Sequence, residues 1–428
     1  MDYLRGIIGI IVLVAFAFLF SNNKRKIDWK LVGIGISLQI TFGLLITKVP
    51  AVAKAFGFVS EKFVIFLSFS GDGARFLFGD LAGTSFGFIF AFQVLPTIIF
   101  FSTVTAGLYY LGVLQKIVYG IAWIMARTMR LSGAESLSAA GNIFLGQTEA
   151  PLLVRPFVPN MTRSELMCLM TGGMATIAGG VLAGYVAFLG GDDLVQQARF
   201  AAYLLSASIM NAPAAIVISK IIIPETEPEK IDTRLTVNDE NLGVNLIDAL
   251  SKGASEGLKL ALNVGGMLLA FIAVIAAINY FLSGFIGEYT GLNAWIVEST
   301  NGQFKGFSLE YILGQGFRLF AFVMGVEWAD TLQVGSLLGQ KTVINEFVAY
   351  LGLADMKSAG TLSAKSTIIA TYALCGFSNF SSIAIQVGGI GGMAPNQQGN
   401  LSKLGMRALL AATIACMMTA TIAGAMAI

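Results

Sequence analysis

The stretch Ala139–Val158 reads AAGNIFLGQTEAPLLVRPFV and places amides and a carboxylate inside an otherwise apolar segment. A continuous helix does not readily hold Gly-Gln-Thr-Glu-Ala-Pro at its centre, because glycine and proline both disfavour helix interiors. Irregular backbone at membrane depth must be buried in protein or line a watery cavity. We therefore predict a hairpin within residues 132–160 that enters the membrane, turns at Gly146–Ala150 and leaves by the same face. The alternative is a short cytoplasmic loop.

The composition of the whole chain supports a membrane location. Of the 428 residues, 56% are hydrophobic and 12% are charged, whereas soluble domains carry about 25% charged residues. The net charge of +2 provides no field that would attract nucleic acids. The absence of histidine excludes Ser-His-Asp and Cys-His catalysis and imidazole metal sites. We expect the three cysteines, Cys168, Cys375 and Cys416, to pack as small hydrophobic residues.

Eight segments are apolar enough to span a bilayer, which needs about 20 such residues. They predict an all-α polytopic membrane protein with transmembrane helices at Leu4–Phe20, Leu31–Ile46, Phe88–Leu114, Leu166–Leu189, Ala198–Ile222, Leu260–Phe281, Ser366–Gly389 and Met406–Ala427. The positive-inside rule places the basic loop Asn22–Lys26 in the cytoplasm, so we predict that both termini lie outside. Interfacial amphipathic helices are predicted at Val52–Leu67, Lys116–Arg130 and Leu246–Leu258.

A second polar cluster repeats the pattern of the first. Asn345 and Glu346 stand in an apolar run at the end of the interrupted segment 306–350, where we predict a second hairpin that enters from outside.

The span that follows each hairpin is predicted to be a broken helix. The first contains the pairs Gly172-Gly173 and Gly179-Gly180, although Gly180-x-x-x-Gly184 is also typical of close helix packing. The second contains Gly376 and Asn379. Two hairpins and two broken helices with opposite orientations indicate inverted repeats, an architecture of secondary transporters.

The residue types at these two clusters limit the class of solute. They comprise two carboxylates, amides and hydroxyls, with no arginine or lysine placed clearly at the centre. Such groups suit a neutral solute rich in N–H and O–H donors, together with a bare cation held near exposed helix ends. A sugar, a nucleobase and a nucleoside all fit this description.

Three strings resemble motifs of the concentrative nucleoside transporter family, in its bacterial, sodium-coupled branch. They are Asn142-Ile-Phe-Leu-Gly-Gln-Thr-Glu-Ala-Pro151, Asn345-Glu-Phe-Val-Ala349 and Cys375-Gly-Phe-Ser-Asn-Phe-Ser-Ser-Ile-Ala-Ile385. The resemblance implies a homotrimer in the lipid of the bacterial inner membrane that imports nucleosides such as uridine with sodium, by an elevator-type alternating-access movement. It implies no enzymatic activity, organic cofactor or nucleic-acid partner.

The resemblance also divides the chain and assigns its site residues. Residues 1–114 and 223–305 would be mainly scaffold, 115–222 mainly transport, and 306–428 would hold the second hairpin, the second broken helix and the last span. The base of the nucleoside would contact Gln147, Thr148, Glu149, Val181 and Phe377. The ribose hydroxyls would contact Glu346, Asn379 and Ser382. Sodium would be bound by side-chain oxygens of Asn142 and Thr176 and by backbone carbonyls of Leu145 and Ile177.

Three other interpretations compete with sodium symport. A proton could be the coupling ion if Glu149 or Glu346 titrates. An intramembrane aspartyl enzyme would use Asp72 with Asp330, although a loop turn explains Asp72 more simply. A channel would lack ion coupling, and the inverted repeats favour alternating access over an open pore.

Overall fold

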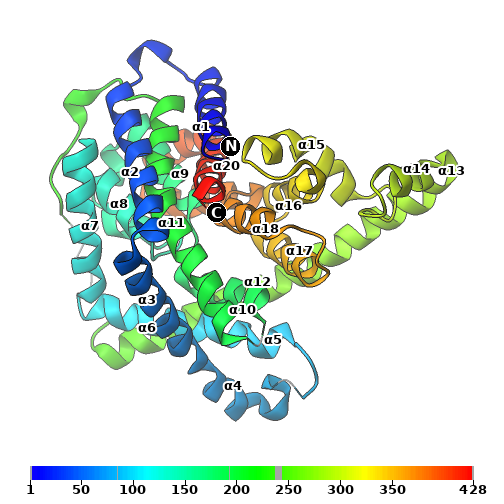
Figure 1. Ribbon diagram of the computed structural model, residues 1–428. Helices are drawn as coiled ribbons and strands as arrows, with labels where there is room; N and C mark the ends of the chain where they lie inside the picture. Colours follow the sequence, from blue (N-terminus) through cyan, green and yellow to red (C-terminus); the bar gives the residue numbers. More distant parts are fainter. Residues whose placement is uncertain (1, 84, 192, 237–242, 427–428) are drawn as a thin grey trace.

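The computed structural model describes residues 2–83, 85–191, 193–236 and 243–426, and in these residues the regular structure is helical throughout (Figure 1). Seven helical segments of the described chain are long and apolar enough to cross a membrane: Asp2–Leu19, Trp29–Lys48, Phe90–Tyr110, Arg163–Gly190, Leu194–Ile222, Leu246–Thr290 and Pro395–Met426. The expected span at 366–389 consists of two shorter helices. The prediction of an all-α polytopic membrane protein is confirmed.

The helices follow one another with short connections. In the first half they are α1 (Asp2–Leu19), α2 (Trp29–Lys48), α3 (Pro50–Ser68), α4 (Ser70–Phe78), α5 (Phe90–Gln93), α6 (Leu95–Tyr110), α7 (Val113–Met129), α8 (Gly133–Gly141), α9 (Arg163–Ala175), α10 (Gly179–Gly190) and α11 (Leu194–Ile222). In the second half they are α12 (Leu246–Asn279), α13 (Glu288–Thr290), α14 (Leu292–Ser299), α15 (Leu309–Val323), α16 (Thr331–Val343), α17 (Glu346–Ser358), α18 (Ala364–Leu374), α19 (Phe380–Met393) and α20 (Gln398–Met426).

The first hairpin consists of α8, an irregular tip at 142–149 and a return limb of short 3-10 turns at Ala150–Val154 and Val158–Asn160. Its two ends lie on the same side of the molecule. The Gly133 amide donates to the Asp232 carbonyl at 2.9 Å, and the Thr162 hydroxyl donates to Glu225 at 2.7 Å, on the segment that follows α11. The chain therefore enters and leaves by one face, and the tip begins four residues before the predicted turn.

The second hairpin is formed by α16 and α17, which meet at Ile344–Asn345. Its two ends are joined because Asp330, just before α16, accepts a hydrogen bond from the Ser363 amide at 3.1 Å, after α17. The predicted limits, 306–350, are wrong, because α15 is a separate helix packed against α16. A methyl group added to Gly339 would lie 2.5 Å from Cβ of Leu313, so the two helices are in close contact.

Both predicted broken helices are present, and their breaks meet. The first helix is interrupted between α9 and α10, and the second between α18 and α19. The Phe377 amide in the second break donates to the Thr176 carbonyl in the first at 3.3 Å. The two repeats therefore cross at their interrupted points.

Two other expectations about local structure need correction. Leu246–Leu258 is not a separate interfacial helix, because it continues without a break into the 34-residue helix α12. Helix α12 is extended by a π-helical segment, Tyr280–Gly287. Asp72 does not lie in a loop, since it is in the first turn of α4.

The first two helices are attached to the centre of the bundle by buried contacts. Gln39 of α2 is fully buried, and its side-chain amide donates to the Met210 carbonyl and to the Thr419 hydroxyl, both at 3.1 Å. The two termini lie near each other (Figure 1), since a methyl on Gly6 would lie 2.7 Å from Cβ of Ala425.

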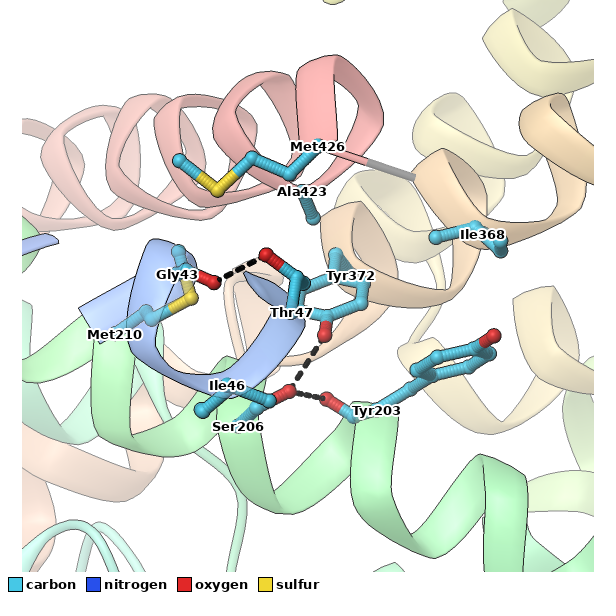
Figure 2. Close-up of a pocket in the computed structure, with 10 residues that line it drawn as sticks. All are labelled: Gly43, Ile46, Thr47, Tyr203, Ser206, Met210, Ile368, Tyr372, Ala423 and Met426. Atoms are coloured by element: carbon cyan, nitrogen blue, oxygen red, sulfur yellow. Dashed lines mark hydrogen bonds between the residues drawn. The ribbon is translucent and has the colours of Figure 1, made fainter. Parts of the chain in front are cut away.

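A cavity of about 140 Å³ lies where α2 faces α11, α18 and α20 (Figure 2). Its polar part is a hydrogen bond of 2.5 Å between the Ser206 and Tyr372 hydroxyls. Its lining contains none of the predicted site residues.

Candidate functional site

Glu346 is held at the tip of the second hairpin as the first residue of α17. Asn345 caps this helix by accepting the Val348 amide at 3.0 Å. The Glu346 side chain is 2% exposed, and its two oxygens accept hydrogen bonds from the Tyr185 hydroxyl at 3.0 Å and the Asn379 amide at 2.9 Å. A carboxylate at a helix N-terminus is stabilised by the helix dipole.

Asn379 links this carboxylate to the second broken helix. It is the N-cap of α19, and its Oδ1 accepts the Ser382 amide at 2.9 Å. The Ser382 hydroxyl in turn accepts a hydrogen bond from Gln147 at 3.0 Å. The structure thus brings Gln147, Glu346, Asn379 and Ser382 into one chain of hydrogen bonds, across both hairpins.

The other predicted base-contacting residues surround this network with different degrees of exposure. Thr148 is exposed, and Glu149 is half-buried with its carboxylate accepting the Gly146 amide at 3.0 Å. Val181 is buried in the first turn of α10, one helical turn before Tyr185 and therefore on the same helix face. Phe377 is half-buried in the second break.

The crossing of the two broken helices is held by one amide side chain. Asn211 of α11 is fully buried and donates to the carbonyls of Ala175 and Cys375, at 2.7 Å each. The Cys416 thiol points to the same two carbonyls at 3.4 and 3.2 Å. All three cysteines are buried and free, as expected. The C-terminal ends of α9 and α18 therefore converge, which concentrates carbonyl groups at the centre.

The predicted cation ligands lie beside the end of α9. Leu145 and Ile177 are buried, and the Thr176 hydroxyl donates to the Gly172 carbonyl at 2.9 Å. Asn142 is fully buried, and neither polar atom of its side chain has a hydrogen-bond partner. Unpaired polar atoms at such depth are costly, so this side chain fits a site that binds a ligand.

The expectation that no lysine lies at the centre is wrong. Lys341, near the end of α16, is 2% exposed, and its ammonium donates to the Ala373 carbonyl in the last turn of α18 at 2.9 Å. The sequence places Lys341 only five residues before Glu346.

Three further residues of the network were not predicted. Tyr185 bonds to Glu346 directly, and its ring stacks on Tyr350 with centroids 4.4 Å apart. Gln386 donates to Gln147 at 3.3 Å and to the Met170 carbonyl at 3.1 Å. Asn211 lies at the crossing. Gln386 follows Ser382 by four residues, so helix periodicity could have identified it.

Sequence families match nearly the whole chain. Residues 8–81 match the family described as Na+ dependent nucleoside transporter N-terminus, and residues 203–424 match the corresponding C-terminus. Residues 91–192, which include the first hairpin and the first broken helix, match a family described as Gate: Nucleoside recognition.

Two curated relatives differ in length from each other. The chain is 43% identical to an uncharacterized transporter of Haemophilus influenzae, over 99% of this chain and 98% of the relative. It is 39% identical to the sodium/nucleoside cotransporter 1 of Mus musculus, over 99% of this chain and 64% of the longer mouse protein.

Solved structures of the transporter CNTnw share the fold. Its inward-facing, substrate-bound state is 39% identical, with a TM-score of 0.87 over 100% of this chain and 98% of CNTnw. An outward-facing variant gives a TM-score of 0.88 at 38% identity, over 100% of this chain and 98% of CNTnw. The relatives are transporters that alternate between faces of the membrane, and the chain belongs to the concentrative, sodium-dependent nucleoside transporter family.

Proposed function

We propose that this protein is a sodium-coupled symporter that imports nucleosides across the bacterial inner membrane by an elevator-type movement. The observation that carries the proposal is the buried carboxylate of Glu346, bonded to Asn379 and connected through Ser382 to Gln147. An acidic group at membrane depth is costly and is a functional site by default. The family match supports a nucleoside as the solute.

The chemistry of the network suits a nucleoside. We propose that Glu346, Asn379 and Ser382 bind the ribose hydroxyls, since a carboxylate accepts strong, charge-assisted hydrogen bonds from them. The side-chain amide of Gln147 can both donate and accept, as the edge of a base requires. Thr148, Glu149, Val181 and Phe377 would complete the base pocket.

Sodium would bind beside this pocket, between the first hairpin tip and the first break. Asn142 and Thr176 would supply side-chain oxygens, and Leu145 and Ile177 would supply carbonyls. Two observations favour this location: the unpaired side chain of Asn142 and the exposed carbonyl end of α9, which attracts cations.

Binding of sodium at this place would couple the ion to the solute. An ion held by Asn142 and Thr176 joins the hairpin tip to the broken helix. The tip carries Gln147, which already bonds to Ser382 in the second repeat. The ion therefore stabilises the arrangement that binds nucleoside, and by linkage the nucleoside strengthens ion binding.

The arrangement of the chain in the membrane extends the proposal. We propose that both termini lie outside and that three copies assemble, with lipid around them. The division into scaffold and transport parts also remains a prediction. Gln39 attaches α2, in the segment predicted to be mainly scaffold, to α11 and α20.

The proposal is tested by uptake of radiolabelled uridine into proteoliposomes. An inward sodium gradient should drive uptake, and unlabelled nucleosides should compete whereas glucose should not. Uptake driven by a proton gradient alone would contradict the cation site at Asn142 and favour titration of Glu149. Uptake that equilibrates without any ion gradient would indicate a channel.

A further inference from the structure

The two repeats present the same electrostatic feature and satisfy it differently. Each has a half-helix, α9 or α18, whose C-terminal end is at the crossing, close to a hairpin tip. The carbonyls at a helix C-terminus lack intrahelical partners and carry partial negative charge. Each end therefore favours a nearby positive charge.

In the first repeat, the hairpin residue at this position is neutral. Asn142 is fully buried, lies against Gly172 in the last turn of α9, and has two polar atoms without a partner. An exchangeable cation is the ligand that such a pocket needs, as proposed above.

In the second repeat, the hairpin itself supplies the positive charge. The ammonium of Lys341 donates to the Ala373 carbonyl at 2.9 Å, and the Tyr350 hydroxyl donates to the Thr371 carbonyl at 2.8 Å. Both groups therefore satisfy the last turn of α18. No carboxylate of the described residues pairs with Lys341 within 4.0 Å. Its direct polar contact is with the helix end, and a buried ammonium requires such a partner.

We propose that Lys341 is a tethered cation that fastens the second hairpin to α18 and so positions Glu346 for the ribose. It would do permanently in the second repeat what an exchangeable ion does in the first. One consequence is that a single ion is exchanged for each nucleoside, because the second helix end already has its charge. The inference rests on the proposed sodium–nucleoside symport and assigns Lys341 as a positioning residue.

The test compares three substitutions at Lys341 in proteoliposomes, with sodium saturating. Lys341→Met should raise the KM for uridine by roughly tenfold or more, as expected for loss of one hydrogen bond to a charged group. Lys341→Gln keeps a donor without the charge and should remain impaired. Lys341→Arg keeps the charge and should recover most of the affinity. Sodium binding to the purified protein without nucleoside should keep its native affinity in Lys341→Met.

Lys357 provides a matched control in the same hairpin. Its ammonium also donates to a carbonyl at a helix end, that of Leu189 at 2.6 Å, but at the end of α17 remote in sequence from Glu346. Lys357→Met should leave the KM for uridine near its native value.

Several outcomes would overturn the inference. They are a native KM in Lys341→Met, equal rescue by glutamine and arginine, and a change confined to sodium affinity. A loss of folding in Lys341→Met leaves the comparison of the glutamine and arginine variants decisive. Failure of the native protein to take up uridine with sodium would instead contradict the proposed symport.

Discussion

The carboxylate of Glu346 accepts a hydrogen bond at each oxygen, and glutamine can accept at only one of the two positions. We predict that Glu346→Gln lowers kcat/KM for uridine uptake by roughly 10- to 100-fold, the range expected for loss of a hydrogen bond to a charged group. The measurement is initial uptake rate against uridine concentration under a fixed sodium gradient.

A substrate lacking one hydroxyl makes this prediction specific to the ribose. Native protein should distinguish uridine from 2′-deoxyuridine, whereas Glu346→Gln should transport the two at similar, low efficiency. The exposed Glu288 provides the control, and Glu288→Gln should behave like native protein. If Glu346→Gln retains near-native uptake, Glu346 does not bind the ribose.

Asn142 is the residue at which ion dependence can be tested separately. Asn142→Ala removes the side-chain oxygen, and we predict that the sodium concentration for half-maximal uptake rises about tenfold or more, equivalent to roughly 1.4 kcal/mol. Asn142→Asp keeps an oxygen at the same place and should retain a sodium response. An unchanged sodium dependence in a folded Asn142→Ala protein would move the cation site elsewhere.

At the scale of the helices, the crossing depends on one side chain from a third helix. Asn211 donates to the ends of both α9 and α18, so its loss leaves two buried carbonyls without their strongest donor. We predict that Asn211→Leu, which preserves volume, destabilises the protein by about 2–4 kcal/mol, since each unsatisfied group costs about 1–3 kcal/mol.

The measurement for Asn211→Leu is the thermal unfolding midpoint in mild detergent. Cys416→Ala is the control at the same place, because it removes only a weak thiol donor to these carbonyls and should lower the midpoint less. Equal effects of the two substitutions would show that the crossing is held by packing and not by the amide of Asn211.

The same elements show how far the sequence predicts the structure. Glycine, proline and polar residues at membrane depth predicted both hairpins and both broken helices, because each of these residue types is costly in an apolar helix. The limits of the second hairpin were wrong because α15 is itself apolar, so composition does not separate it from α16.

Contacts between distant segments limited the prediction of the site. Motif residues such as Glu346 and Asn379 carry local signals, and the structure joins them. Tyr185 is an ordinary aromatic residue in an apolar helix, and it becomes a partner of Glu346 only through tertiary packing. Lys341 was missed for a similar reason, since the Ala373 carbonyl to which it donates carries no signal in the sequence.

At the scale of the whole molecule, large apolar faces remain exposed in the single chain. On α12, Leu262, Leu269 and Val274 are more than half exposed, and on α4 the exposed fractions of Phe76 and Leu77 are 89% and 72%. Lipid and neighbouring subunits are the partners that such faces require. We predict that chemical crosslinking in mild detergent yields products up to a trimer and none larger. A monomeric mass by light scattering would contradict this assembly.

The elevator movement is the last prediction, and the contact between α6 and α10 allows it to be tested. The predicted close packing of Gly180-x-x-x-Gly184 is found here: a methyl on Gly180 would lie 3.8 Å from the Ser102 hydroxyl, and one on Gly184 would lie 3.0 Å from Val94. Helix α6 belongs to the predicted scaffold and α10 to the predicted transport part. A disulfide between them should therefore block transport.

The variant carries Ser102→Cys with Gly180→Cys, and its uptake of uridine should be lost on oxidation and restored by reduction. The control is Gly391→Cys with Gln398→Cys, which joins α19 to α20 within one predicted part. Their Cβ atoms would be 3.7 Å apart, within the range for a disulfide. Crosslinked control protein should continue to transport, because a bond inside a rigid part does not oppose its movement. If the protein crosslinked between α6 and α10 transports equally well, these two helices do not slide past each other, and the movement must take place at another interface.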